Sequence, residues 1–277
     1  MAEILANGLE HYYTIEGQGP PLLLVHGAFV DSRMWDPQAA YFSKKYSVIR
    51  YDLRGHGKTG RSAISSYSME LFAEDLHALM AALKVDQVFL CGLSLGGMIA
   101  QTYAVLNPGR IKALILTDTA VSVRLTLSDK LQRYILAPKW AMLAIIRWMS
   151  VPRFVDFSFK LAQWTRSAEW FGQDPSTAEY VHQTMLSIPT EEYLKIYQAI
   201  YEFDLLELSR ITVPTLILNG EKESRAVFRH GEEMLQRIPD SIAGIIQGAG
   251  HTSNMENPAV FNNYVDRFLS STRSQGE

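Results

Sequence analysis

A serine between two glycines is the residue of this chain best suited to nucleophilic chemistry. Ser94 stands in Gly92-Leu-Ser-Leu-Gly96, directly after the apolar run 88–91 and before a segment with helical periodicity. In this strand–turn–helix context the pattern is specific, because the two glycines permit a sharp turn that exposes the hydroxyl above a sheet. The helix N-terminus that follows favours developing negative charge. The motif therefore predicts an activated serine.

A serine hydroxyl needs a base to accept its proton, and His251 is the best placed of the seven histidines. It follows the last predicted strand, residues 242–246, and a glycine leads into it. His26 and His56 stand in strand-end loops, where we expect them to shape turns. The remaining histidines fall in an opening hairpin region or in helical patterns: His11, His77, His182 and His230.

A third group should orient the imidazole and stabilise its charged form. We prefer Glu223, which follows the predicted strand 215–218. Glu221 beside it, and Asp118 at the end of an earlier strand, remain open as alternatives.

Attack by Ser94 on a carbonyl carbon creates an oxyanion that needs two preorganised N–H donors. We expect one from Leu95 at the helix start and the other from Ala28, in the turn His26-Gly-Ala-Phe29. Each such donor stabilises the transition state by about 3 kcal/mol.

The elements that must position these residues alternate between strands and helices. Helical periodicity covers residues 67–83 and 98–106. Strands alternating with helices indicate an α/β fold, with a mostly parallel sheet covered on both faces. The predicted strands are apolar on both faces, as buried parallel strands are: 22–25, 47–51, 85–91, 111–117, 215–218 and 242–246.

The alternation stops between residues 121 and 208, where the pattern is helical only. We therefore divide the chain into an α/β core, residues 1–120 and 209–277, and a helical cap, residues 121–208. A helical insertion of this kind usually lies over the carboxyl ends of the strands, where ligands bind. The cap holds four of the five tryptophans.

We expect most cap aromatics to pack within the cap, and some to reach the substrate. The residues predicted to line the substrate site are Phe29, Trp140, Trp148 and Trp170. The apolar run 141–149, which Arg147 interrupts, has an alternative interpretation as an interfacial helix. Its location in the cap favours packing of the cap on the core.

Composition excludes several classes of protein. The 277 residues include 26 Lys and Arg against 29 Asp and Glu, for a net charge of −3, which argues against binding nucleic acid or an anionic membrane. The most apolar stretch, residues 141–149, is nine residues long, whereas a membrane span needs about 20. With one cysteine and no visible signal peptide, we expect a cytoplasmic protein, monomeric or homodimeric, without stable membrane insertion.

We expect neither a metal nor a cofactor. No two histidines stand four residues apart beside a carboxylate, and the glycine-rich segment 92–97 lacks the lysine of a phosphate loop.

Together these motifs resemble the α/β-hydrolase superfamily, over about residues 22–269. The resemblance implies an eight-stranded, mostly parallel sheet with helices on both faces and a helical cap. It also implies the order nucleophile, acid and base for Ser94, Glu223 and His251, although the family usually has aspartate where Glu223 stands. Three segments are similar to 3-oxoadipate enol-lactonases and related bacterial esterases: 34–38, 91–98 and 169–171.

The function implied is hydrolysis of a small to medium, apolar carboxylic ester or lactone through an acyl-serine. Serine at position 94 excludes the branch of the fold that uses an aspartate nucleophile. One alternative is C–C bond hydrolysis of a diketone, whose enzymes often have asparagine where this chain has Leu93. Another is a receptor-like binding protein that retains the triad.

Overall fold

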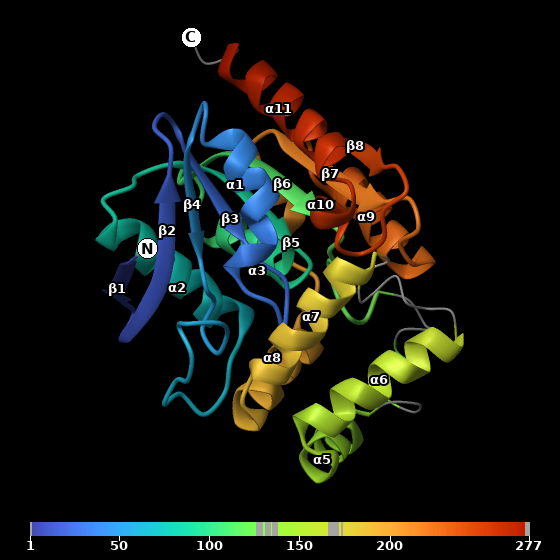
Figure 1. Ribbon diagram of the computed structural model, residues 1–277. Helices are drawn as coiled ribbons and strands as arrows, with labels where there is room; N and C mark the ends of the chain where they lie inside the picture. Colours follow the sequence, from blue (N-terminus) through green and yellow to red (C-terminus); the bar gives the residue numbers. More distant parts are fainter. Residues whose placement is uncertain are drawn as a thin grey trace.

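An eight-stranded sheet forms the centre of the molecule in the computed structural model, which describes residues 2–125, 130, 134, 138–165, 172 and 174–274 (Figure 1). Its strand order is β1-β2-β4-β3-β5-β6-β7-β8. The pairs β1–β2 and β2–β4 are antiparallel, and all others are parallel, which confirms the predicted sheet. The strands are β1 Ala2–Ala6, β2 Leu9–Glu16, β3 Pro21–Val25, β4 Ser47–Tyr51, β5 Val88–Leu93, β6 Ile111–Thr117, β7 Thr215–Gly220 and β8 Ser241–Ile246.

Helices cover both faces of the sheet, because right-handed crossovers in opposite directions place their helices on opposite faces. The helix α1 packs against α11 on one face, and α2 packs against α3 on the other. β5 and β7 are buried along their whole length between these layers. The helices around the sheet are η1 Ser32–Trp35, α1 Asp36–Phe42, α2 Met69–Ala82, α3 Leu95–Leu106, η4 Leu208–Arg210, α9 Arg225–Arg237, α10 Ser253–Glu256 and α11 Pro258–Ser274.

Between β6 and β7, the regular elements in the described residues are helices, as the sequence predicts. They are α5 Lys139–Met149, α6 Val151–Thr165, α7 Pro175–Ser187 and α8 Thr190–Glu202, followed by the short η4. Figure 1 shows α7 and α8 next to the sheet, with α5 and α6 farther out. Asp174 caps α7 by accepting hydrogen bonds from the N–H groups of Ser176 and Thr177. Within the described ranges, every helix is too short or too polar to cross a membrane.

Three tryptophans in the helices after β6 are not packed inside that helical region, although such packing was expected of most aromatic residues there. Trp140, Trp148 and Trp164 are 75%, 83% and 83% exposed. The reason lies in the helix surface: α5 buries the side that carries Ile146, while Trp140 and Trp148 stand two turns apart on the opposite side. Phe154 of α6 packs against the buried core cluster.

Candidate active site

Ser94 occupies a strained turn between β5 and α3. Its φ of 54° lies in the left-handed region that non-glycine residues rarely adopt. The flanking glycines make this turn possible, since a Cβ on Gly92 would lie 2.2 Å from the Gly96 carbonyl oxygen, and one on Gly96 would lie 2.1 Å from that of Val25. The Thr119 hydroxyl donates a 2.6 Å hydrogen bond to the Ser94 carbonyl oxygen and helps to hold the turn. The sequence gives no local signal for this last contact.

His251 faces the Ser94 hydroxyl. Its Nε2 atom lies 3.0 Å from Ser94 Oγ, which is hydrogen-bonding distance. The loop after β8 that carries His251 is fixed by Glu256, whose carboxylate accepts hydrogen bonds from the Gly250 N–H and the Thr252 hydroxyl, both at 2.6 Å. The structure thus brings together the predicted nucleophile and base, which are 157 residues apart in sequence.

Glu223 reaches the other side of the imidazole. Its Oε2 atom lies 2.5 Å from His251 Nδ1, and its Oε1 atom accepts a 2.6 Å hydrogen bond from the Ser224 N–H. The carboxylate is fully buried. A carboxylate facing Nδ1 favours the tautomer with its proton there, which leaves Nε2 free to accept the Ser94 proton.

The two alternative acids have other partners. Glu221 accepts a 2.8 Å hydrogen bond from the Gly248 N–H. Asp118, buried at the end of β6, accepts hydrogen bonds from the Gly220 N–H at 2.8 Å and from the Ser253 hydroxyl. Of the three carboxylates, Glu223 therefore has the direct contact with the imidazole.

The buried charges set the protonation states of the site. Burial alone would lower the pKa of His251, but the adjacent Glu223 carboxylate raises that pKa above its ordinary value. Burial, and then the charge of Glu223, raise the pKa of Asp118. The site therefore stabilises an imidazolium beside Glu223 and disfavours a second full negative charge at Asp118.

The predicted oxyanion turn lies beside the nucleophile. A Cβ on Gly27 would lie 3.6 Å from Ser94 Cβ, and Ala28 follows directly. His26 shapes this turn, as expected, because its Nδ1–H donates to the Gly27 carbonyl oxygen at 2.7 Å while Nε2 accepts from the Leu53 N–H at 2.9 Å. Leu95 is the first residue of α3, so its N–H has no acceptor within the helix.

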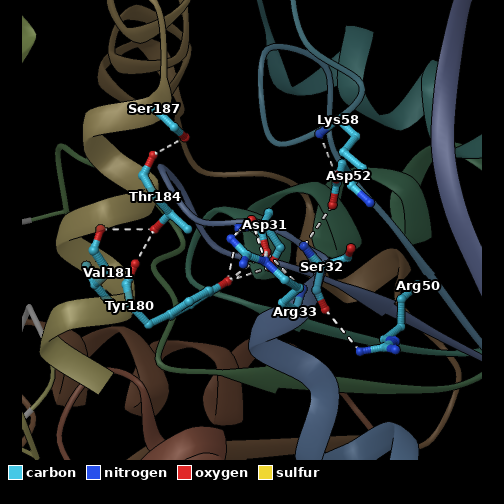
Figure 2. Close-up of polar contacts among 10 residues, drawn as sticks. All are labelled: Asp31, Ser32, Arg33, Arg50, Asp52, Lys58, Tyr180, Val181, Thr184 and Ser187. Carbon is cyan, nitrogen blue, oxygen red and sulfur yellow. Dashed lines mark hydrogen bonds and ion pairs between the residues drawn. The ribbon is translucent and has the colours of Figure 1, made fainter. Parts of the chain in front are cut away.

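A network of polar contacts fixes the loop that follows this turn (Figure 2). The Tyr180 hydroxyl of α7 lies 3.0 Å from both the carbonyl oxygen and the Oδ1 atom of Asp31. The Asp52 carboxylate accepts hydrogen bonds from the N–H groups of Ser32 and Lys58. The sequence shows Asp31 only as a residue suited to cap η1. The structure adds its link to α7, which connects the helices after β6 with the predicted oxyanion turn.

The residues predicted to line the substrate site lie in different places. Phe29 has a φ of 63° and stacks on Tyr193 of α8, with ring centroids 3.9 Å apart. Trp140 and Trp148 point to solvent on α5, so the structure does not bring them to Ser94. Trp170 lies outside the described residues. Helical periodicity alone does not identify Tyr193 as a contact of Phe29.

The described side chains do not include three or more His, Cys, Asp or Glu placed to hold a metal ion. The acidic residues around His251 instead accept hydrogen bonds from neighbouring backbone and hydroxyl groups.

The sequence model of the α/β hydrolase fold matches residues 20–258, from the start of β3 to the start of α11. This chain belongs to the α/β hydrolase fold family. The match spans all three residues of the Ser94–His251–Glu223 constellation. The architecture is thus that of the superfamily which the motifs resemble.

This α/β hydrolase is similar to proteins named as lactonases and esterases. It is 27% identical over 264 residues to 3-oxoadipate enol-lactonase 2 of Acinetobacter baylyi, covering 93% of this chain and 92% of that one. The enol-lactonase structure from Burkholderia xenovorans superposes with a TM-score of 0.81 at 27% identity, covering 97% and 100% of the two chains. A thermophilic esterase from Thermogutta terrifontis gives 0.82 at 25% identity, covering 98% of each.

Proposed function

We propose that this α/β hydrolase cleaves a carboxylic ester or lactone through an acyl intermediate on Ser94. The observation that carries the proposal is the continuous contact from Ser94 Oγ to His251 Nε2, at 3.0 Å, and from His251 Nδ1 to Glu223, at 2.5 Å. The enol-lactonase and esterase relatives support the same class of substrate.

In the first half of the reaction, Ser94 Oγ attacks the carbonyl carbon and His251 Nε2 accepts its proton. The buried Glu223 carboxylate stabilises the imidazolium that forms. The N–H groups of Leu95 and Ala28 stabilise the oxyanion. The C–O bond then breaks, and the leaving alkoxide takes the proton from His251, which releases an alcohol or opens the lactone ring.

In the second half, water attacks the acyl-serine carbonyl while His251 accepts a proton from it. Collapse of this second tetrahedral intermediate breaks the bond to Ser94 Oγ, which regains its proton from His251. The products are a carboxylic acid and an alcohol, or one hydroxy acid from a lactone.

The division into a core, residues 1–120 and 209–277, and a cap, residues 121–208, is part of the proposal. Two contacts support it: the stacking of Phe29 on Tyr193, and the hydrogen bond from Tyr180 to Asp31. Both join a helix between β6 and β7 to the loop after β3. In this arrangement the cap forms one wall of the site where the acyl group binds.

An uncharged, apolar acyl group fits the side chains nearest the predicted oxyanion turn. Phe29, Tyr193 and Phe154 form an aromatic cluster there, with 6.1 Å between the ring centroids of Phe154 and Tyr193. By contrast, Arg147 lies 3.1 Å from Glu191 on the surface, where both side chains are exposed. In the described part of the cap, this arginine is thus directed away from the site.

We expect kcat/KM for p-nitrophenyl esters to rise about fourfold for each methylene added to the acyl chain, until the pocket is full. The reason is the transfer of apolar surface from water to the aromatic cluster. The measurement is a series of acyl lengths from acetate to decanoate, with a neutral butyrate ester competing against 3-oxoadipate enol-lactone, which carries charge. Efficient turnover of the charged lactone alone would contradict the apolar assignment.

Glu223→Gln is expected to lower kcat by about 10⁴-fold while the fold is kept, because an amide no longer favours the productive tautomer or stabilises the imidazolium. Asp118→Asn should have a much smaller effect, since the Asp118 carboxylate accepts hydrogen bonds from the Gly220 N–H and the Ser253 hydroxyl. The measurement is kcat for both variants, with thermal unfolding as a check on the fold. The reverse ranking would assign the acid role to Asp118.

The pH profile gives a second readout of the Glu223 role. The carboxylate raises the pKa of His251, so its removal should lower that pKa. Since the base acts only when neutral, the acidic limb of kcat/KM should move to lower pH in Glu223→Gln. An unmoved limb would indicate that Glu223 is not coupled to the catalytic histidine.

A further inference from the structure

The outer side of the helices α5 and α6 is unusually apolar. Six large side chains there are 41–83% exposed, and we call them the α5–α6 aromatic face: Trp140, Ile145, Trp148, Phe157, Leu161 and Trp164. Single exposed apolar residues are ordinary, but a cluster of this kind marks an interaction site. None of the six belongs to the Ser94 site.

Helical spacing places the exposed apolar side chains together on one side of each helix. Trp140 and Trp148 are eight residues apart on α5, and Phe157, Leu161 and Trp164 follow one stripe of α6 at spacings of four and three. The opposite sides of the two helices are buried, through Ile146 on α5 and through Val151, Val155 and Ala162 on α6. The buried sides are available for packing between helices. The helix α5 contacts α6 and α8, and α6 contacts α7.

Positive charge accompanies the aromatic face. Arg153 and Lys160 are exposed on α6 and interleave with Phe157 and Trp164 at helical spacing. Residues 139–165 hold four Lys and Arg against one acidic residue, Asp156, whereas the whole chain has a net charge of −3. Asp156 itself lies 2.8 Å from His182 Nε2.

Two other basic residues of this segment face α8 and pair with it. Lys139 pairs with Glu202, and Arg147 pairs with Glu191. In the described part of the chain, Arg153 and Lys160 are therefore the cations most closely associated with the exposed aromatic stripe.

We propose that the α5–α6 aromatic face binds peripherally to an anionic phospholipid surface. Helices that lie in the interface of a bilayer combine Trp, Phe and Leu with Lys and Arg in this way. Indole rings favour the headgroup level, and each basic residue near an anionic surface contributes attraction. The net charge of the chain argues against such binding, but among the described residues beside this face the cations Arg153 and Lys160 outnumber the single acidic residue Asp156.

A second copy of the chain fits the face less well. In a two-fold symmetric dimer the same patch meets itself, so Arg153 and Lys160 of both copies would lie in one interface. Like charges brought together in this way oppose association, whereas anionic headgroups would neutralise them.

Vesicle binding by the full chain tests the proposal. Flotation with large unilamellar vesicles of phosphatidylcholine containing phosphatidylglycerol should recover the protein with the lipid, and pure phosphatidylcholine vesicles should recover much less. Binding should fall when the salt concentration is raised, because the charge attraction is screened. Tryptophan emission should shift to the blue on binding, since exposed indoles enter the interface.

Two double variants separate the apolar and charge contributions. Trp148→Ser/Trp164→Ser should weaken binding by at least about a hundredfold, about tenfold for each indole withdrawn. Arg153→Glu/Lys160→Glu should weaken it by at least about 25-fold, about fivefold for each charge removed. The matched controls are Leu5→Ser/Leu106→Ser and Lys44→Glu/Lys112→Glu, which change exposed residues elsewhere and should bind as the wild type does.

Thermal unfolding and far-UV circular dichroism check that each variant is folded. The proposal is overturned if folded wild-type protein does not float with phosphatidylglycerol vesicles, or if the test variants bind as tightly as their controls. It is also overturned if sedimentation velocity shows a dimer that Trp148→Ser/Trp164→Ser converts to monomer, because a second copy would then occupy the face.

Discussion

Ser94→Ala is expected to lower the kcat for ester hydrolysis by about 10⁶-fold, the loss typical of a triad nucleophile. The methyl group leaves His251 without a hydroxyl to deprotonate, and no acyl-serine forms. The change removes only one oxygen atom, and the glycines that permit the turn remain, so the free energy of unfolding should change little. The measurement is turnover of p-nitrophenyl butyrate.

Ser66→Ala is the matched control for this variant. Ser66 is exposed in the loop before α2, and its replacement should leave kcat unchanged. Retention of more than about a hundredth of wild-type turnover by Ser94→Ala, in purified protein of verified mass, would contradict the assignment of Ser94 as nucleophile. A receptor-like binding protein would instead show only slow turnover in the wild type as well.

His251→Ala should cause a loss of similar size, and the Ser94→Ala/His251→Ala double variant should lose nothing further. The two residues act in one proton transfer across the 3.0 Å contact, so removing either one abolishes the same step. The measurement is single-turnover kinetics of the two single variants and the double variant. Losses that add would indicate that the two side chains act separately.

His182→Ala provides the histidine control. His182 lies on α7 and contacts Asp156, away from the Ser94 site, so its replacement should leave kcat within about twofold, as expected for a surface change.

The positions of Ser94, His251 and Glu223 could be predicted because parallel strands end at a common edge. Each residue follows a strand, β5, β8 or β7, and short loops keep all three near that edge. The sequence could not decide between Glu223 and Asp118, since β6 and β7 are neighbouring parallel strands and each carboxylate follows the carboxyl end of one of them. The choice between them depends on which carboxylate lies next to His251 Nδ1, and the packing of the loops determines that.

Helical periodicity reveals only part of α3. The periodic pattern covers residues 98–106, whereas the helix begins at Leu95, directly after Ser94, where the expected oxyanion donor places the helix start. The glycines at 96 and 97 hide the helical pattern, although Gly96 allows the helix to lie close to the end of β3 and Gly97 allows it to lie close to Thr119. In this turn, close packing outweighs intrinsic helix propensity.

The exposure of Trp140 and Trp148 could not be predicted from their apolar character. The helix α5 has apolar residues on nearly all sides, so its sequence does not identify the buried side. Contact with α8 determines that choice, and it leaves Trp140 and Trp148 on the outer side. Both were expected to line the substrate site, whereas the aromatic contact with the Phe29 turn comes from Tyr193.

The central claim, that Ser94 is the nucleophile of an ester-hydrolysing site, is tested most directly by covalent labelling. Diethyl p-nitrophenyl phosphate is added to the wild-type protein, and intact mass and peptide mapping are measured alongside residual turnover. We predict one diethylphosphoryl group per chain, on Ser94, with turnover lost in proportion to labelling and no adduct in Ser94→Ala. Loss of turnover with the adduct on another side chain, or full turnover by protein completely labelled at Ser94, would contradict the account.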